Sequence, residues 1–149
     1  MDRLAYVLLP LVGGAFIAAQ APVNARLRLV LDSALGSALV SFLVGIAILL
    51  VAVLAVGEAG NVLAGLGGGP WWAYLGGPLG AVFVVAALVA APRVGVTATF
   101  VAVITGQVLL AALIDRFGLL GQPAIAVTPE RIVAIGLLGV SVVLLARST

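Results

Sequence analysis

Long apolar runs alternate with short charged stretches along the whole of this chain. A helix that crosses a bilayer needs about 20 mostly apolar residues, and charged side chains are costly inside the bilayer, so charges mark where such runs end. The pattern therefore predicts an all-α membrane protein with five transmembrane helices in a single integral membrane domain over residues 1–149. The expected spans are residues 4–21, 34–56, 71–91, 97–114 and 132–146.

Local signals indicate how these helices begin and how they are connected. Residues 32–33 (Asp-Ser) can cap the second span, and residues 128–130 (Thr-Pro-Glu) offer an N-cap, a proline and an acid to the start of the fifth. Pro92 is expected to turn the third span into the fourth. The glycine-rich residues 57–70 are expected to form a mobile loop.

Composition supports the membrane assignment and excludes most enzyme chemistry. Of the 149 residues, 64% are hydrophobic and 8% are charged, whereas soluble domains carry about 25% charged residues. The chain has no Cys and no His, which removes thiolate nucleophiles and the commonest metal ligand and neutral-pH base. We therefore expect no enzyme activity, no metal and no cofactor. The net charge of +2, without a basic run, argues against nucleic acid as a partner.

The basic residues divide almost evenly between the two sides of the membrane. An excess of Lys and Arg in short loops on one side sets the orientation of a membrane protein. A weak bias predicts insertion in both orientations, and hence an antiparallel, dual-topology homodimer. The N-terminal side carries Arg3, Arg116 and Arg131, and the other side carries Arg26, Arg28, Arg93 and Arg147.

The aromatic residues favour the same arrangement. Tyr6, Trp71, Trp72 and Tyr74 are all expected on the N-terminal side, and Trp and Tyr prefer the membrane–water interface. A second, inverted copy would give each membrane surface such a belt. The alternative is that small chains often have lopsided belts and a weak charge bias.

Three amide side chains are candidates for a polar binding site. Gln107 is expected near the middle of its span, roughly 12 Å from the nearer end. Gln20 and Asn24 share one helix face four residues apart, and Pro22 between them removes a backbone donor. Such groups could bind a polar solute or cation. They could equally restore the hydrogen bonds of a broken helix and hold a neighbouring helix.

Small residues four apart indicate close helix packing, because they allow two backbones to approach in lipid. Serine hydroxyls in such a series could face a cavity, but a bond to the carbonyl of the preceding turn is favoured. Trp72 and Tyr74 could form an aromatic gate, although membership of the interfacial belt is favoured. The packing candidates are Ser33, Ser37 and Gly45, with Ser41 also a binding candidate, and Gly76 and Gly80 in the third span.

None of the five carboxylates falls within an expected span. Proton exchange at a carboxylate in the middle of the membrane is therefore not supported. Facilitated diffusion remains open, as does coupling through the boundary acids Asp32 or Asp115. No phosphate-binding loop is present, so ATP is not expected as a partner.

The order and spacing of several motifs resemble the YdcZ-like family of the drug/metabolite transporter superfamily. The resemblance covers nearly the whole chain, and Arg116 stands where the family pattern often has His. It implies a five-helix protomer of the drug/metabolite transporter type in the bacterial inner membrane, and a transporter formed by two inverted copies. The motifs lie at residues 14–15, 20–27, 41–42, 72–81, 91–95, 106–107 and 115–118.

We therefore predict an exporter-like secondary transporter or facilitator for a small polar or amphipathic metabolite, with its site between two inverted protomers. The expected partners are the lipid bilayer, a second copy of the chain and an unidentified small molecule. A dimeric ion or solute channel and a non-transporting assembly subunit remain alternatives. The candidate substrate-binding residues are Gln20, Asn24, Gln107, Ser41, Trp72 and Tyr74.

Overall fold

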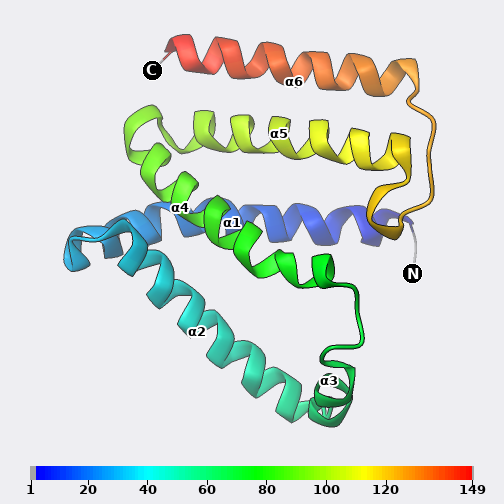
Figure 1. The fold of residues 1–149 in the computed structure, drawn as a ribbon. Helices are drawn as coiled ribbons and strands as arrows, with labels where there is room; N and C mark the ends of the chain where they lie inside the picture. The colour runs from blue at the N-terminus through cyan, green and yellow to red at the C-terminus, as the bar shows by residue number, and fades with distance from the viewer. Residues whose placement is uncertain (1–2, 149) are drawn as a thin grey trace. The chain divides into compact units, whose positions relative to one another are not determined.

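The computed structural model describes residues 3–148, and every regular element in that range is helical (Figure 1). Five of its helical segments are long and apolar enough to cross a membrane, which confirms the all-α chain with five candidate spans. The helices are α1 (Arg3–Leu31), α2 (Ala34–Ala55), α3 (Ala59–Gly65), α4 (Gly76–Val94), α5 (Val96–Phe117) and α6 (Pro129–Ser148), with short 3₁₀ helices η1 (Trp71–Leu75) and η2 (Leu119–Gly121).

The chain forms two compact units, one up to Val89 and one from Ala90. The first contains α1, α2, α3, η1 and most of α4. The second contains the last turn of α4 together with α5, η2 and α6. The boundary between the units therefore falls inside one continuous helix.

In the first unit, α1 and α2 diverge from a short turn (Figure 1). Helix α1 continues through Pro22 to Leu31, beyond residue 21, where the first span was expected to end. The turn uses Asp32 in a left-handed conformation with φ of 48°. Ser33 then has an extended backbone, and its hydroxyl accepts a hydrogen bond from the Gly36 N–H at 2.9 Å. This serine is the N-cap of α2, as the sequence predicts.

A small apolar core holds α4 against α2. Ala38 of α2 and Val84 and Leu88 of α4 are buried together, and Phe42 packs against this cluster. An added Cβ at Gly80 would lie 3.8 Å from the ring of Phe42, which is ordinary van der Waals contact. Gly80 therefore lies beside an aromatic ring of the neighbouring helix.

The glycine-rich stretch before α4 contains more structure than expected. Helix α3 lies within it, and a tyrosine of η1 binds its last part. The Tyr74 hydroxyl accepts hydrogen bonds from the Gly67 N–H at 2.9 Å and the Gly69 N–H at 3.4 Å. The stretch over residues 57–70, expected to form a mobile loop, therefore contains a short helix.

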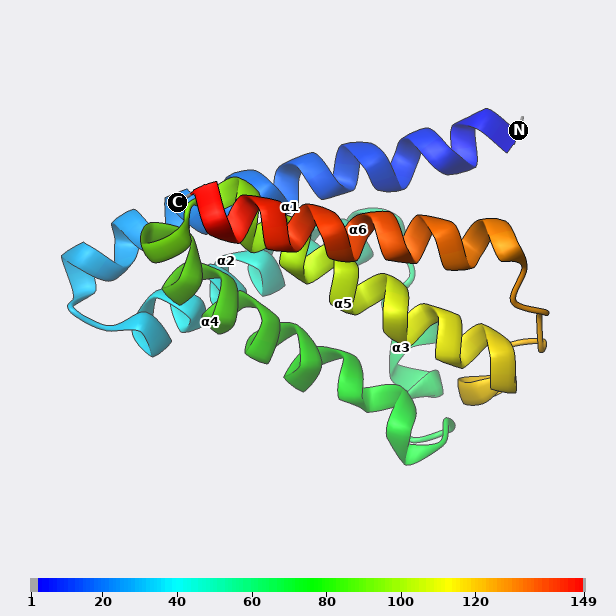
Figure 2. The same ribbon diagram turned by 90° about the horizontal axis from the view of Figure 1, so that it is seen from above.

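In the second unit, α5 and α6 lie side by side and run in opposite directions (Figures 1 and 2). Helix α4 continues through Pro92, and the turn into α5 occurs at Gly95, whose φ of 83° suits glycine. Pro92 is therefore not the turning residue. Helix α5 ends at left-handed Gly118, and the Ile125 N–H donates to the Asp115 carbonyl oxygen at 2.7 Å. The connection to α6 thus folds back onto the end of α5.

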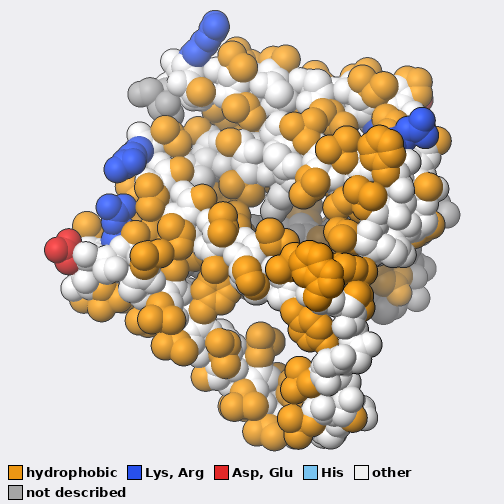
Figure 3. Space-filling view, viewed as in Figure 1, with side chains coloured by type: hydrophobic (Ala, Val, Ile, Leu, Met, Phe, Trp, Pro, Cys, Tyr) orange, Lys and Arg blue, Asp and Glu red, His pale blue; other side chains and the backbone are white. Residues whose placement is uncertain are grey.

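Most of the apolar surface is exposed in the single chain. The apolar windows of the five candidate spans are between 0% and 17% buried. Hydrophobic side chains cover much of the face in Figure 3, and basic side chains lie at its edges. Because contiguous apolar surface of this extent is not stable in water, lipid must cover it.

Candidate functional site

Polar side chains of α1 and α2 meet in two pairs. Gln20 Nε2 donates to Ser41 Oγ at 3.4 Å, and Ser37 Oγ donates to the Asn24 carbonyl oxygen at 2.7 Å. Gln20 and Asn24 lie four residues apart on α1, and Ser37 and Ser41 lie four residues apart on α2. Each helix therefore presents its two polar residues on one face. We call these four residues the amide–serine seam.

Asn24 is the least satisfied member of the seam. The residue is 3% exposed, and its Nδ2 atom is buried without a hydrogen-bond partner among the described residues. Ser37, at 0% exposure, is bonded to the main chain of Asn24 and leaves the side-chain amide free. A buried donor without a partner costs about 1–3 kcal/mol. The seam therefore holds an unused donor at a position where water cannot reach it.

A hollow of about 240 Å³ lies beside the seam. Its polar lining comes from Gln20 and Ser41, and the rest is apolar. Pockets for drug-sized ligands enclose about 300–1,000 Å³, so this hollow suits a smaller solute. Its lining residues are Gln20, Ser41, Phe42, Gly45, Ile46 and Leu49.

Two serines of α2 do not form the hydrogen bonds that the sequence favours. Ser37 and Ser41 bond to α1 and not to the preceding turn of their own helix. Elsewhere the favoured pattern does occur, because Thr105 Oγ1 donates to the Val101 carbonyl at 2.7 Å and Ser141 Oγ to the Leu137 carbonyl at 2.9 Å. A serine hydroxyl that bonds to another helix shows that the two helices are in contact.

The remaining candidates are not members of the seam. Gln107, in the middle of α5, belongs to the second unit, is exposed, and has no side-chain hydrogen bond within the described part of the chain. Trp72 is 37% exposed on η1, and the Tyr74 hydroxyl is engaged by the glycine loop. An added Cβ at Gly76 would meet no atom within 4 Å. Within the first unit, the structure thus brings together Gln20, Asn24 and Ser41 but not Trp72 and Tyr74.

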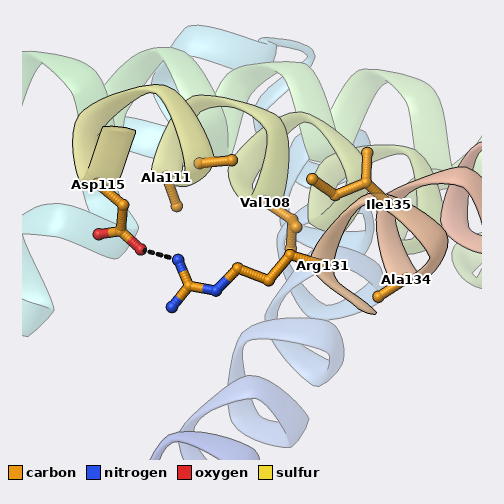
Figure 4. Close-up of a pocket in the computed structure, with 7 residues that line it drawn as sticks. Val108, Ala111, Asp115, Arg131, Ala134 and Ile135 are labelled. Atoms are coloured by element: carbon orange, nitrogen blue, oxygen red, sulfur yellow. Dashed lines mark hydrogen bonds and ion pairs between the residues drawn. The ribbon is translucent and has the colours of Figure 1, made fainter. Parts of the chain in front are cut away.

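An ion pair that the sequence analysis missed joins α5 to α6. Arg131 Nη1 donates to Asp115 Oδ2 at 2.8 Å, next to a hollow of about 180 Å³ between the two helices (Figure 4). Both residues were predicted on the same side of the membrane with opposite charges, and that signal could have found the pair. The rest of the lining of this hollow is apolar and consists of Val108, Ala111, Ala112, Ala134 and Ile135.

The sequence matches the model of a known protein family. A family model described as "Putative inner membrane exporter, YdcZ" matches residues 5–144. The chain belongs to this family. It is accordingly an inner-membrane protein of an exporter family, and the family is one of transporters and not of enzymes. No curated protein and no solved structure matches the chain.

For this member of the YdcZ family, the chemistry of the seam is that of hydrogen bonding alone. Amide and hydroxyl groups of Gln20, Asn24, Ser37 and Ser41 are neutral, and between residues 3 and 148 no group of three His, Cys, Asp or Glu side chains could hold a metal ion. The seam can therefore recognise polar groups of a solute by direct hydrogen bonds.

Proposed function

We propose that this YdcZ-family protein exports a small polar or amphipathic metabolite and binds it at the amide–serine seam. The observation that carries the proposal is the buried, unpaired Nδ2 atom of Asn24. Native proteins pair nearly all buried polar groups. Asn24 does not line the hollow but lies one helical turn from Gln20, which does, so a solute in the hollow that extended toward Asn24 would complete its unpaired donor.

The neighbouring bond supports the same role. The Gln20 to Ser41 distance of 3.4 Å is long for a hydrogen bond, whose usual length is about 2.9 Å. A weak bond costs little to exchange for a bond to a solute. Gln20 and Ser41 also line the hollow, so a solute that entered it would meet both side chains.

We further propose that two inverted copies form the transporter. Gln107 exposes an amide on a helix whose other exposed side chains are largely apolar, and such a group is costly in lipid. In an antiparallel pair with its two-fold axis in the membrane plane, both copies of Gln107 would lie at similar depth. The even division of arginines and the one-sided aromatic belt support this arrangement.

We propose that the solute crosses the membrane by secondary transport or facilitated diffusion. The seam contains no carboxylate, and Asp32, Asp115 and Glu130 lie at or next to helix ends. A solute can therefore bind at the seam without exchanging a proton there.

The binding site is tested with purified protein. A thermal-shift screen against a metabolite library identifies a ligand, because a ligand of the folded state raises its apparent stability. We expect the shift to disappear in Asn24→Leu and Gln20→Leu, and to persist in the control Val23→Leu, since Val23 is 65% exposed next to the seam. A shift that survives both seam substitutions refutes the site.

Transport itself is tested in proteoliposomes with the same ligand. Saturable uptake with counterflow supports a transporter, whereas conductance at near-diffusional rates supports a channel. Loss of bound proteins without any change of flux in Gln107→Leu would support an assembly subunit. For the inverted pair, a reporter at the C-terminus is expected to give signal from both sides of the membrane; signal from one side alone contradicts it.

A further inference from the structure

The hollow between α5 and α6 has a different chemistry from the amide–serine seam. It combines one carboxylate, one guanidinium and an otherwise apolar lining. All of its residues belong to the unit that begins at Ala90. Ligand binding at this hollow is therefore independent of the role proposed for the seam.

The ion pair is placed against the preference of both helices. Asp115 lies in the last turn of α5, where the helix dipole favours cations, and Arg131 lies in the first turn of α6, where it favours anions. Exchanging the two residue types would suit both helix ends better. Stability of the individual helices therefore does not explain why the charges stand as they do.

The pair also leaves much of its hydrogen-bonding capacity unused. The contact joins one guanidinium nitrogen to one carboxylate oxygen, although Arg and Asp can form two parallel bonds. The side chains are 41% and 33% exposed, so the remaining donors of Arg131 and the second oxygen of Asp115 are accessible. A ligand can thus engage both charges without separating them.

We propose that this hollow binds a small zwitterion with an apolar body. Its carboxylate would pair with the guanidinium of Arg131, its ammonium group with the carboxylate of Asp115, and its apolar part would fill the space against Ala111 and Ile135 (Figure 4). A ligand without net charge suits a site without net charge, because no uncompensated charge is carried into a partly buried position. The volume of about 180 Å³ limits the ligand to a small molecule.

The test compares three probes that share one isobutyl group: leucine, isopentylamine and isocaproate. Binding is measured by titration calorimetry on the purified full chain in lipid nanodiscs. We expect leucine to bind, and each singly charged probe to bind about tenfold to a hundredfold more weakly, because each loses one charge-assisted contact. Equal binding of all three probes, or no binding of leucine at millimolar concentration, overturns the proposal.

Variants locate the site. Asp115→Asn and Arg131→Gln are each expected to weaken leucine binding by about tenfold or more. Ala111→Leu fills the hollow and leaves both charges in place, so it is expected to abolish binding even if the charge variants fail to fold. Ala102→Leu, the same change at an exposed position of α5 outside the hollow, is the matched control. Unchanged leucine binding in Ala111→Leu overturns the proposal.

Discussion

Replacing Asn24 by leucine is expected to make the protein more stable and less active. The unpaired Nδ2 atom costs about 1–3 kcal/mol in the folded state. Leucine has the same number and branching of side-chain heavy atoms and no donor, so the substitution removes this cost. The hydrogen bond from Ser37 survives, because it ends on the main-chain carbonyl of residue 24. We therefore expect the free energy of unfolding to rise by about 1–2 kcal/mol.

The same substitution removes the donor that we assign to the metabolite. Flux in proteoliposomes is expected to fall by about tenfold or more, which corresponds to the loss of one hydrogen bond of about 1.4 kcal/mol. Unfolding is followed by titration with a denaturing detergent in mixed micelles, and flux with the ligand found by thermal shift. Val23→Leu should change neither quantity, since the Val23 side chain is 65% exposed in the single chain.

Two results would refute this reasoning. A loss of stability in Asn24→Leu would mean that the amide has a partner in the assembled protein. A gain of stability with full flux would mean that the unpaired donor has no part in transport. Only the combination of higher stability and lower flux agrees with a donor reserved for a ligand.

Three further substitutions test other parts of the fold. Ser37→Ala removes the buried bond between α1 and α2 and should lower the free energy of unfolding by about 0.5–1.5 kcal/mol, measured in the same detergent titration. Gly118→Ala places a Cβ 3.1 Å from the Gln122 carbonyl oxygen at a φ of 60°, and should cost about 1–2 kcal/mol; an unchanged midpoint would contradict the left-handed helix end. Tyr74→Phe removes the acceptor for the Gly67 N–H, so hydrogen exchange should accelerate at residues 67–69 while α4 exchanges as before.

The sequence predicts the helices well where charge and caps coincide with the ends of apolar runs. The second span, expected over residues 34–56, is observed as Ala34–Ala55, because Ser33 caps its start. Helix α1 is longer than expected, since Arg26 and Arg28 near a helix end can extend their charged groups toward water without ending the helix. Pro22 also lies inside α1 without ending it, because a proline removes only one backbone hydrogen bond from the helix.

The site is predicted only in part, since periodicity shows which residues share a face but not which helix that face meets. The spacing of Gln20 and Asn24 makes them candidates, yet nothing in the spacing pairs them with Ser41 and Ser37. That pairing depends on how α1 and α2 pack, which is a tertiary property. The ion pair at Asp115 was within reach of sequence reasoning, because its two charges oppose the dipoles of their own helices.

The sparse burial of the chain affects how its sequence can change over time. Within the described residues, Leu88 and Ser37 are the largest side chains that are fully buried. Positions surrounded by fluid lipid impose no fixed volume, so exchanges among Leu, Ile, Val and Phe there should be nearly neutral. Members of such a lineage can therefore diverge widely in overall identity, and on the role proposed for it the amide–serine seam would be the part that selection holds constant.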